Sequence, residues 1–540
     1  MKNIFRILVL LVTHFLFLPF SNHAQNFVWA KGAGHVGNEA ANAVAVDEAG
    51  NTYITGNLAG MINFSGTFYQ GKGLYDVVLA KYDAAGNLQW VKTAGGKRND
   101  QGNTLKYRNG FLYVGGFFED TAWFENTMVI SKGEADAFVA KYDANGNLIW
   151  LTVGGGTELD FISSVDVDAN GNVYACGTFE KTMTIDTFQL TTTNIYSESF
   201  ICKLNASGKV QWTKATKGNN INLLTGIAVS ASNDVFVTGF FGGMFSINNQ
   251  TMYSNSPSYD VLLARLDNNG NLQWIKTAGS NYEDAATAIA VDGEGNPVIT
   301  GYFAGIATFG SNTITYHDYN DVFVAKYDAA GNNLWVRAGK GQQLDVGYAI
   351  TVDADNNIFA TGVFQGTAVF DGYTVTGIDR EIFMVSYSPT GTVRWVQKAG
   401  GINTDCGLGI AVKSNGNVVI CGYYIHTCYF GNIQIDYADG NDLFVAEYDP
   451  PFVSNLPATV ADYTYSLYPN PAEDFILVSS DKAKAPYIQV NIFDSRGALV
   501  LNQSIQVPTG YLSLQTLSAG FYNVLVTDGQ YCKALKLVVK

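Results

Sequence analysis

Acidic side chains recur about every sixty residues in this sequence, and each one opens an apolar run. Such a series of carboxylates could line a site for a cation or a glycan. Alternatively, each carboxylate accepts hydrogen bonds from nearby backbone N–H groups and fixes a turn, as short acids commonly do. Because a ligand site rarely needs seven equal copies, we interpret the series as structural. Its members are Asp76, Asp136, Glu198, Asp260, Asp321, Glu381 and Asp442.

Three histidines, His35, His317 and His426, lie beyond residue 24. Each stands alone, without the H-x-x-x-H or C-x-x-C spacing of a zinc site. The sequence also has no G-x-S-x-G nucleophile motif and no phosphate-binding loop. The motifs therefore give no support for an enzyme, a metal or another cofactor. A catalytic site assembled from distant segments would leave no such motif.

One segment partly matches a calcium-binding loop. Residues 166–171 read D-V-D-A-N-G, like the first half of such a loop, but Gly177 stands where the closing Glu is required. Similar D-x-x-G-N strings begin at Asp83 and at Asp328. We therefore expect an ordinary turn at Asp166 and keep calcium as the alternative.

Tryptophan and glycine show that the whole chain is repetitive. Seven of the eight tryptophans form a series with separations of 61, 60, 62, 62, 61 and 60 residues, and Trp123 alone falls outside it. A glycine series has the same period. The two series are Trp29, Trp90, Trp150, Trp212, Trp274, Trp335 and Trp395, and Gly56, Gly116, Gly177, Gly239, Gly301, Gly362 and Gly422.

Each period predicts four short β-strands joined by turns rich in Gly, Asn and Asp. In the fifth copy these strands are residues 287–292, 297–303, 321–328 and 333–339. No segment has helical periodicity. Antiparallel four-stranded units repeated in this way indicate an all-β fold, a seven-bladed β-propeller over residues 25–449.

The phase of the repeat predicts how the ring closes. Residues 26–32 have the pattern of the fourth strand of a unit, but the first three strands of that unit are absent before them. The last copy has the first three strands and ends after the third, at residues 442–448. We expect these two segments to pair, which removes the exposed edges of an open array.

Two charged residues depart from the repeat in the strand expected innermost. Lys106 and Asp166 stand where other copies have aliphatic residues such as Val46 and Ala45. Because side chains alternate between the faces of a strand, the two charges can face one gap between neighbouring blades. We expect an ion pair shorter than about 6 Å between them. The alternative is two separately solvated residues.

The repeat, A-V-D-x-x-G-N-x-Y-x-T-G followed by D-x-F-V-A-K-Y-D-x-x-G-N-L-x-W, resembles the bacterial seven-bladed propeller repeats called SBBP repeats, over residues 26–449. That family is defined by its repeat. The resemblance implies a propeller fold and no single activity.

The composition changes after residue 449. Prolines at 450, 451 and 457 indicate an extended linker over residues 450–464. Alternating strands over residues 465–540 predict a small β-sandwich. Its motif residues are Tyr468, Pro469, Asn470, Pro471, Gly497, Gly520, Tyr522 and Lys536.

These motifs resemble the type A C-terminal sorting domain of the type IX secretion system. The resemblance implies a Bacteroidota-like source, transport across the outer membrane by the type IX machinery, and removal of the tail by its sortase-like peptidase. A generic adhesion-type sandwich is the alternative.

The N-terminus has the pattern of a signal peptide over residues 1–24, with Lys2 and Arg6 before an apolar run at 7–20. That run is shorter than the roughly 20 residues of a membrane-spanning helix. We expect cleavage between Ala24 and Gln25 and a protein that is secreted or displayed on the outer cell surface.

The net charge bears on the possible partners, and the cysteine spacing bears on disulfide formation. The chain has 32 basic and 47 acidic residues and a net charge of −15, which argues against nucleic acid or an anionic membrane as a partner. The spacing of the six cysteines defines no disulfide framework, and we expect buried free thiols.

The connections between strands are rich in Tyr, Asn, Ser and Thr, which suit polar recognition. Those expected on one face of the ring contain His35, His317, His426 and Tyr424. We predict that this candidate ligand face binds a glycan or a protein. The alternatives are an extracellular hydrolase or lyase with a composite site, and a structural surface component.

Overall fold

The computed structural model describes residues 26–450 except 256–257, 317–318 and 437–438, and residues 465–540 except 481–486, 495–498, 507 and 528–531. The predicted signal peptide, its cleavage site at Ala24 and Gln25, and linker residues 451–464 lie outside the described residues. All the regular secondary structure of the described residues is β-strand. These residues contain no helix long and apolar enough to cross a membrane.

Within the described residues, the repeat forms seven four-stranded antiparallel units in which each strand pairs with the next strand of its unit. Units one to three are β2 (Ala40–Val46), β3 (Thr52–Leu58), β6 (Asp76–Tyr82) and β7 (Leu88–Gly96); β8 (Asp100–Arg108), β9 (Phe111–Phe124), β10 (Thr127–Asp143) and β11 (Leu148–Gly156); and β12 (Phe161–Val167), β13 (Val173–Phe179), β16 (Glu198–Leu204) and β17 (Val210–Ala215). Units four to six are β19 (Asn222–Val229), β20 (Val235–Gly242), β23 (Tyr259–Leu266) and β24 (Leu272–Ala278); β25 (Ala285–Val291), β26 (Pro297–Phe303), β29 (Asp321–Tyr327) and β30 (Asn333–Gly341); and β31 (Val346–Val352), β32 (Ile358–Phe370), β33 (Tyr373–Tyr387) and β34 (Val393–Gly401).

Unit seven joins the two ends of the repeat region. It contains β35 (Cys406–Val412), β36 (Val418–Tyr424), β39 (Asp442–Asp449) and the N-terminal strand β1 (Asn26–His35). β1 pairs antiparallel with β39, from Phe27 opposite Tyr448 to Ala33 opposite Leu443, so the predicted pairing of the two segments is confirmed.

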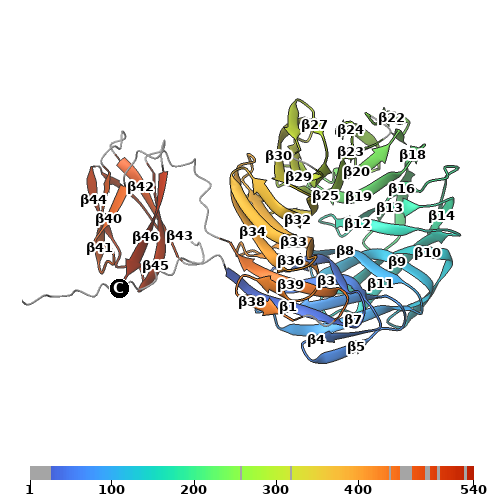
Figure 1. Ribbon diagram of the computed structural model, residues 1–540, viewed down its shortest axis with the longest axis horizontal. Coiled ribbons are helices and arrows are strands. Elements are labelled where there is room, and N and C mark those ends of the chain that lie inside the picture. Colours follow the sequence, from blue (N-terminus) through green and yellow to red (C-terminus); the bar gives the residue numbers. More distant parts are fainter. Residues whose placement is uncertain are drawn as a thin grey trace, which may run out of the picture.

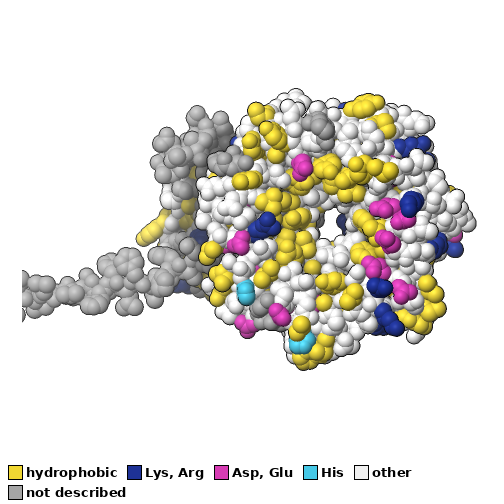
Figure 2. Space-filling model, turned by 45° about the vertical axis from the view of Figure 1, so that its right-hand side comes forward, with side chains coloured by type: hydrophobic (Ala, Val, Ile, Leu, Met, Phe, Trp, Pro, Cys, Tyr) yellow, Lys and Arg dark blue, Asp and Glu magenta, His cyan; other side chains and the backbone are white. Residues whose placement is uncertain are grey.

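The first strands of the units contact one another in cyclic order, from β2 through β8, β12, β19, β25 and β31 to β35 and back to β2. The units are arranged around a centre (Figure 1), where Figure 2 shows an opening with charged side chains gathered on one side. This radial arrangement of antiparallel sheets is a β-propeller.

Each unit also pairs with its neighbour through a hairpin between its second and third strands. The first strand of the hairpin pairs with the end of the preceding unit's fourth strand, as β4 does with β1 and β14 with β11. In units two and six the hairpin continues the long strands β9–β10 and β32–β33. The separate hairpins are β4 (Met61–Phe64) and β5 (Thr67–Gln70), β14 (Thr182–Ile185) and β15 (Phe188–Thr191), β21 (Met244–Ile247) and β22 (Gln250–Tyr253), β27 (Ile306–Phe309) and β28 (Asn312–Thr315), and β37 (Cys428–Phe430) and β38 (Ile433–Ile435); the two-residue β18 (Lys217–Gly218) pairs with β21.

In six of the seven units, the turn before the fourth strand packs against a tryptophan of the preceding unit. A Cβ added to Gly86 would lie 2.5 Å from the Trp29 ring, and one added to Gly391 would lie 2.6 Å from the Trp335 ring. These turn glycines also have positive φ, +80° at Gly86. Glycine is required there both by the backbone conformation and by the indole packed against it.

The apolar side chains meet between neighbouring units. One cluster, for example, combines Val298 and Val324 of unit five with Ile350, Ala360 and Phe383 of unit six. Burial between sheets is the main favourable contribution to such packing.

The described part of residues 465–540 forms two antiparallel sheets. One contains β40 (Tyr465–Tyr468), β41 (Phe475–Ser480) and β44 (Thr509–Ser513), and the other contains β43 (Leu499–Gln506), β42 (Tyr487–Phe493), β45 (Gly520–Thr527) and β46 (Cys532–Val539). Ile476 of the first sheet and Val490 and Val524 of the second belong to one hydrophobic cluster.

Candidate functional site

One face of the propeller carries the long connections, and we call it the loop face. There, the fourth strand of each unit leads to the first strand of the next, and the second strand leads to the third. In residues 26–450, all exposed large apolar side chains except Val28, Ile149 and Leu334 belong to these connections. Ile195 is 90% exposed and Ile378 is 78% exposed. Exposed apolar groups therefore concentrate at this edge of the units, and the tight turns at the other edge carry none.

The recurrent acids at the start of the third strands are buried beneath the loop face. Asp76 Oδ2 accepts hydrogen bonds from the N–H groups of Lys72 and Gly73, at 2.7 and 3.1 Å. Asp260 Oδ2 accepts one from Asn255 N at 2.8 Å, and Asp321 Oδ1 accepts one from Gly341 N at 2.9 Å. Asp136, Glu198 and Glu381 also accept backbone hydrogen bonds. These acids thus fix the corners of the units.

A second series of buried acids was not anticipated from the sequence. It lies just before or at the start of the first strands, and each member interacts electrostatically with a third-strand acid of the preceding unit, as Asp100 does with Asp76. Its spacing equals that of the tryptophans, which is the signal that could have revealed it. The members are Glu39, Asp100, Asp160, Asp284, Asp345 and Asp405, with Asn222 at the equivalent place before unit four.

The two acids of a pair converge. A Cβ added to Gly95 would lie 2.3 Å from Asp76 Oδ1 and 2.6 Å from Asp100 Oδ2. The pKa of Asp100 is raised to about 7 and that of Asp160 to about 8, chiefly by burial, and the neighbouring third-strand acid contributes to each rise. Both acids of these pairs are inaccessible to solvent or nearly so, so they do not reach a ligand on the surface.

Lys106 and Asp166 lie close together, as the departures from the repeat predict. Lys106 Nζ is 3.6 Å from Asp166 Oδ1, and the lysine side chain is 46% exposed. Asp166 Oδ2 also accepts a hydrogen bond from Val229 N at 2.7 Å. These contacts link the innermost strands of units two, three and four.

The segment that partly matches a calcium loop forms a turn. Asp168 Oδ1 accepts hydrogen bonds from the N–H groups of Asn170 and Asn172, both at 2.9 Å. Its Oδ2 accepts one from the Asn172 amide at 2.7 Å. Within the described ranges, no three His, Cys, Asp or Glu side chains are grouped as metal ligands.

The described residues expected on a ligand face lie in different surroundings. His35 packs edge-on against Phe68 at 5.5 Å between ring centroids, whereas His426 is exposed on a different connection. His317 lies outside the described residues. Tyr424 was wrongly placed on this face: it is 1% exposed, and its hydroxyl donates to the Asp436 carbonyl at 2.6 Å. Its strand continues to residue 424, so the alternation directs the ring into the core.

The described cysteine side chains are free and buried. Cys176 and Cys202 lie on paired strands but belong to different hydrophobic clusters, because their side chains point to opposite faces of the sheet. Cys406, Cys421 and Cys428 likewise belong to three different clusters.

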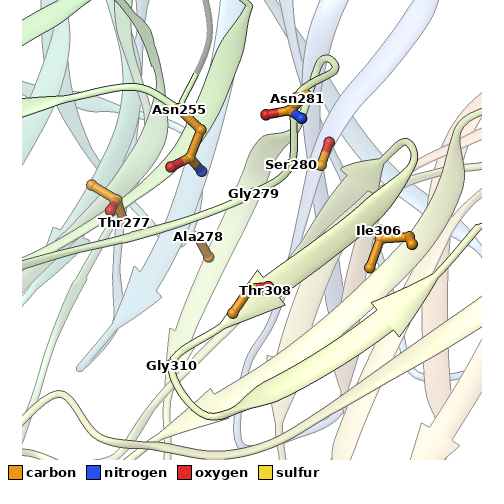
Figure 3. Close-up of a pocket in the computed structure, with 9 residues that line it drawn as sticks. All are labelled: Asn255, Thr277, Ala278, Gly279, Ser280, Asn281, Ile306, Thr308 and Gly310. Carbon is orange, nitrogen blue, oxygen red and sulfur yellow. The ribbon is translucent and has the colours of Figure 1, made fainter.

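A groove of about 490 Å³ opens where unit four meets unit five. Its lining comes from the end of β24, the turn that follows it, β27 and the turn after it, and Asn255 in the connection after β22 (Figure 3). Most of the lining is polar: Asn255, Thr277, Ala278, Gly279, Ser280, Asn281, Ile306, Thr308 and Gly310.

Among the joins between neighbouring units, the groove lies at the one with the fewest paired backbone positions. β1 pairs with β4 at three positions, and β7 pairs with β9 at two. Between units four and five the pairing is reduced to a single bridge, Gly279 opposite Thr308. Beyond this bridge, the turn after β24 and the hairpin β27–β28 separate, which leaves space between them.

Ser280 accounts for part of this separation. Its hydroxyl donates to Asp284 Oδ2 at 2.8 Å and accepts a hydrogen bond from Tyr282 N at 2.9 Å, so the turn is held away from the hairpin. His35 is the equivalent residue of unit seven, and it still pairs with Ile62 of the hairpin in unit one. A side chain at this position is therefore not sufficient to open a groove. Five units have glycine here, and a Cβ added to three of them would lie 1.7–2.2 Å from a hairpin carbonyl oxygen: Gly96, Gly156 and Gly401.

Several sorting-motif residues lie together in the tail. Asn470 Nδ2 donates to the Lys536 carbonyl at 2.7 Å, and Val538 N donates to Asn470 Oδ1 at 2.9 Å. The Tyr522 hydroxyl donates to the Ser518 carbonyl at 2.7 Å. Tyr468 is exposed, Gly520 begins β45, and Gly497 lies outside the described residues. The motif thus ties the start of the tail to its last strand.

Comparison with curated proteins finds similarity over part of the chain. The chain is 23% identical over 378 residues to the uncharacterized WD repeat-containing protein L264 of Acanthamoeba polyphaga mimivirus, covering 55% of this chain and 27% of that protein. The chain thus spans about a quarter of that relative's length.

Two solved structures are similar at 11% identity. Sqt1 from Chaetomium thermophilum has a TM-score of 0.39, covering 78% of this chain and 99% of that one. The WD40 β-propeller domain of Doa1 has a TM-score of 0.36, covering 78% of this chain and 96% of that one.

Residues 466–540 match the family described as the secretion system C-terminal sorting domain. This module indicates export by the type IX secretion system to the cell surface or the extracellular space.

Proposed function

We propose that the seven units are the blades of one closed propeller over residues 25–449 whose loop face binds a glycan or a protein outside the cell. The carrying observation is the distribution of exposed apolar side chains, which concentrate in the connections of that face. Exposed apolar groups gathered among polar ones are typical of interaction sites. Because the sorting domain directs the chain out of the cell, we expect its ligand to be extracellular.

The buried acid pairs favour binding over hydrolysis. A glycoside hydrolase commonly needs two carboxylates that reach the substrate and flank the reacting bond. In the described residues the paired acids, such as Asp260 and Asp284, are fully buried behind backbone. They recur at nearly every join, as structural groups do.

The experiment is a binding screen of the full chain against glycans and extracellular matrix proteins, followed by variants on the two faces. Ile195→Glu, Ile306→Glu and Ile378→Glu each place a charge on an exposed apolar position in a different part of the loop face. Ala85→Glu places the same charge on an exposed turn at the opposite edge. Loss of binding in any of the first three variants, with Ala85→Glu unaffected, supports the proposal. Equal loss in all four variants, loss in Ala85→Glu alone, loss in none, or no ligand at all, contradicts it and favours a structural surface component.

We also infer that residues 450–464 are a linker and that residues 465–540 are a sandwich removed during export by the sortase-like peptidase of the type IX machinery. The match of residues 466–540 to the sorting-domain family supports this inference. Intact-mass measurement of the secreted protein tests it, because a product that retains residue 540 would contradict it.

A further inference from the structure

The groove between units four and five presents free hydrogen-bonding groups. In the described residues, the side chains of Asn255, Thr277, Asn281 and Thr308 have no protein partner, although they line a common space (Figure 3). An amide side chain offers two donors and an acceptor, and a hydroxyl offers a donor and an acceptor. This mixture matches a ligand whose own groups both donate and accept, as sugar hydroxyls do.

An exposed aromatic residue, Tyr282, directly follows the groove residue Asn281 in the chain. Tyr282 is 60% exposed, and its ring lies over Gly305, where an added Cβ would be 2.6 Å from the ring. Its backbone N–H is held by Ser280 Oγ at 2.9 Å, and Ile306, 65% exposed, lies next to Gly305. A rigid, exposed aromatic face beside polar groups suits a ligand with one apolar and one polar side. Pyranose rings have this character, with C–H groups on one face and hydroxyls at the edge.

The electrostatics of the groove disfavour an anionic ligand. The residues that line it include no Lys or Arg. Behind Gly279 stand two carboxylates, since a Cβ added there would lie 2.8 Å from Asp260 Oδ1 and 2.9 Å from Asp284 Oδ2. A uronic acid or sulfate would find no cation to pair with and would approach these acids on a chain of net charge −15.

We propose that this groove binds a short neutral oligosaccharide, with Tyr282 stacked on one sugar ring and with Asn281 and Thr308 hydrogen-bonded to its hydroxyls. Its volume of about 490 Å³ is within the range typical of small-ligand sites, roughly 300–1,000 Å³. The proposal rests on the proposed function, because it assigns the ligand class and the position on the propeller.

The test uses the full chain on an array of neutral, uronic-acid and sulfated oligosaccharides, followed by calorimetry with the best neutral probe. We expect Tyr282→Ala to weaken binding at least tenfold. Asn281→Ala and Thr308→Val each should weaken it several-fold, and the valine keeps the shape of the strand residue. Tyr429→Ala removes a comparably exposed tyrosine, 47% exposed, from another hairpin and should stay within twofold of wild type. Thermal melting confirms that each variant is folded.

The outcomes separate this proposal from the broader one. Binding that survives the groove variants, a preference for acidic glycans, or a protein as the sole ligand would each overturn the groove assignment and leave extracellular binding by the propeller in place. Failure of the wild-type chain to bind any glycan or protein would overturn both.

Discussion

Trp29 Nε1 donates a hydrogen bond of 2.7 Å to Glu447 Oε2, joining two residues 418 positions apart. The equivalent tryptophans Trp150 and Trp274 donate to backbone carbonyls of a turn in the next unit. In unit seven, a carboxylate stands at the position in the third strand that holds a cation in units one to five. Lys413 Nζ and the Asn417 amide also contact Glu447. The closing unit therefore has its own buried polar network.

Glu447→Gln should destabilise the protein by about 3–5 kcal/mol, the usual cost of leaving one partner of a buried ion pair without its counter-charge. Lys413 and Glu447 are only 3% and 4% exposed, so water does not compensate. Urea denaturation measures the change. Glu134→Gln, at an exposed site, is the matched control and should change stability by less than about 0.5 kcal/mol.

Deletion of residues 26–32 should lower the melting temperature markedly and cause self-association, because β39 becomes an exposed edge strand. Calorimetry and analytical ultracentrifugation check both effects. A synthetic peptide of residues 26–35 should restore the melting temperature by completing unit seven. A truncated monomer that melts like the full chain would contradict this account of closure.

Gly86→Ala should be more destabilising than Gly110→Ala, by about 1–3 kcal/mol, the usual cost of overpacking. Both glycines have positive φ, +80° and +84°, so the backbone cost is shared. They differ in space, since a Cβ at Gly86 would lie 2.5 Å from the Trp29 ring whereas one at Gly110 meets nothing within 4 Å. Equal losses in urea denaturation would show that the indole does not require the glycine.

Stability should fall as pH rises from about 5 to 8. Burial raises the pKa of Asp100, Asp284 and Asp405 to about 7. Unfolded aspartate titrates near 4, so over this interval the folded chain holds protons that the unfolded chain has released. Unfolding then releases protons, and a higher pH favours it. Urea denaturation across this range measures the slope.

Asp100→Asn should make this slope shallower by removing one titrating group, and Asn222 shows that a join accepts an amide here. A matched control is Asp186→Asn, which changes an exposed aspartate outside the acid pairs and should leave the slope unchanged. Stability that instead rises between pH 5 and 8 would rule out proton retention by the acid pairs.

The repeat alone determined the four-stranded units and the closure by β1, because regularly spaced Trp, Gly and Asp residues specify local turns and strand alternation. The third-strand acids were also assigned their role as backbone acceptors from repetition. The approach of Lys106 to Asp166 followed from strand parity, which is a local property. The matched module at residues 466–540 was likewise readable, because its motifs are contiguous.

Other features depend on contacts between units. Asp100 and its counterparts share the tryptophan spacing, yet only the packed joins bring each one against a third-strand acid. Tyr424 resembled a loop residue until its strand directed it into the core. The groove beside Ser280 exists because a turn and a hairpin from different units pair at one position in place of two or three. Local periodicity specifies each unit, whereas the gaps between units depend on side chains that meet only in the folded ring.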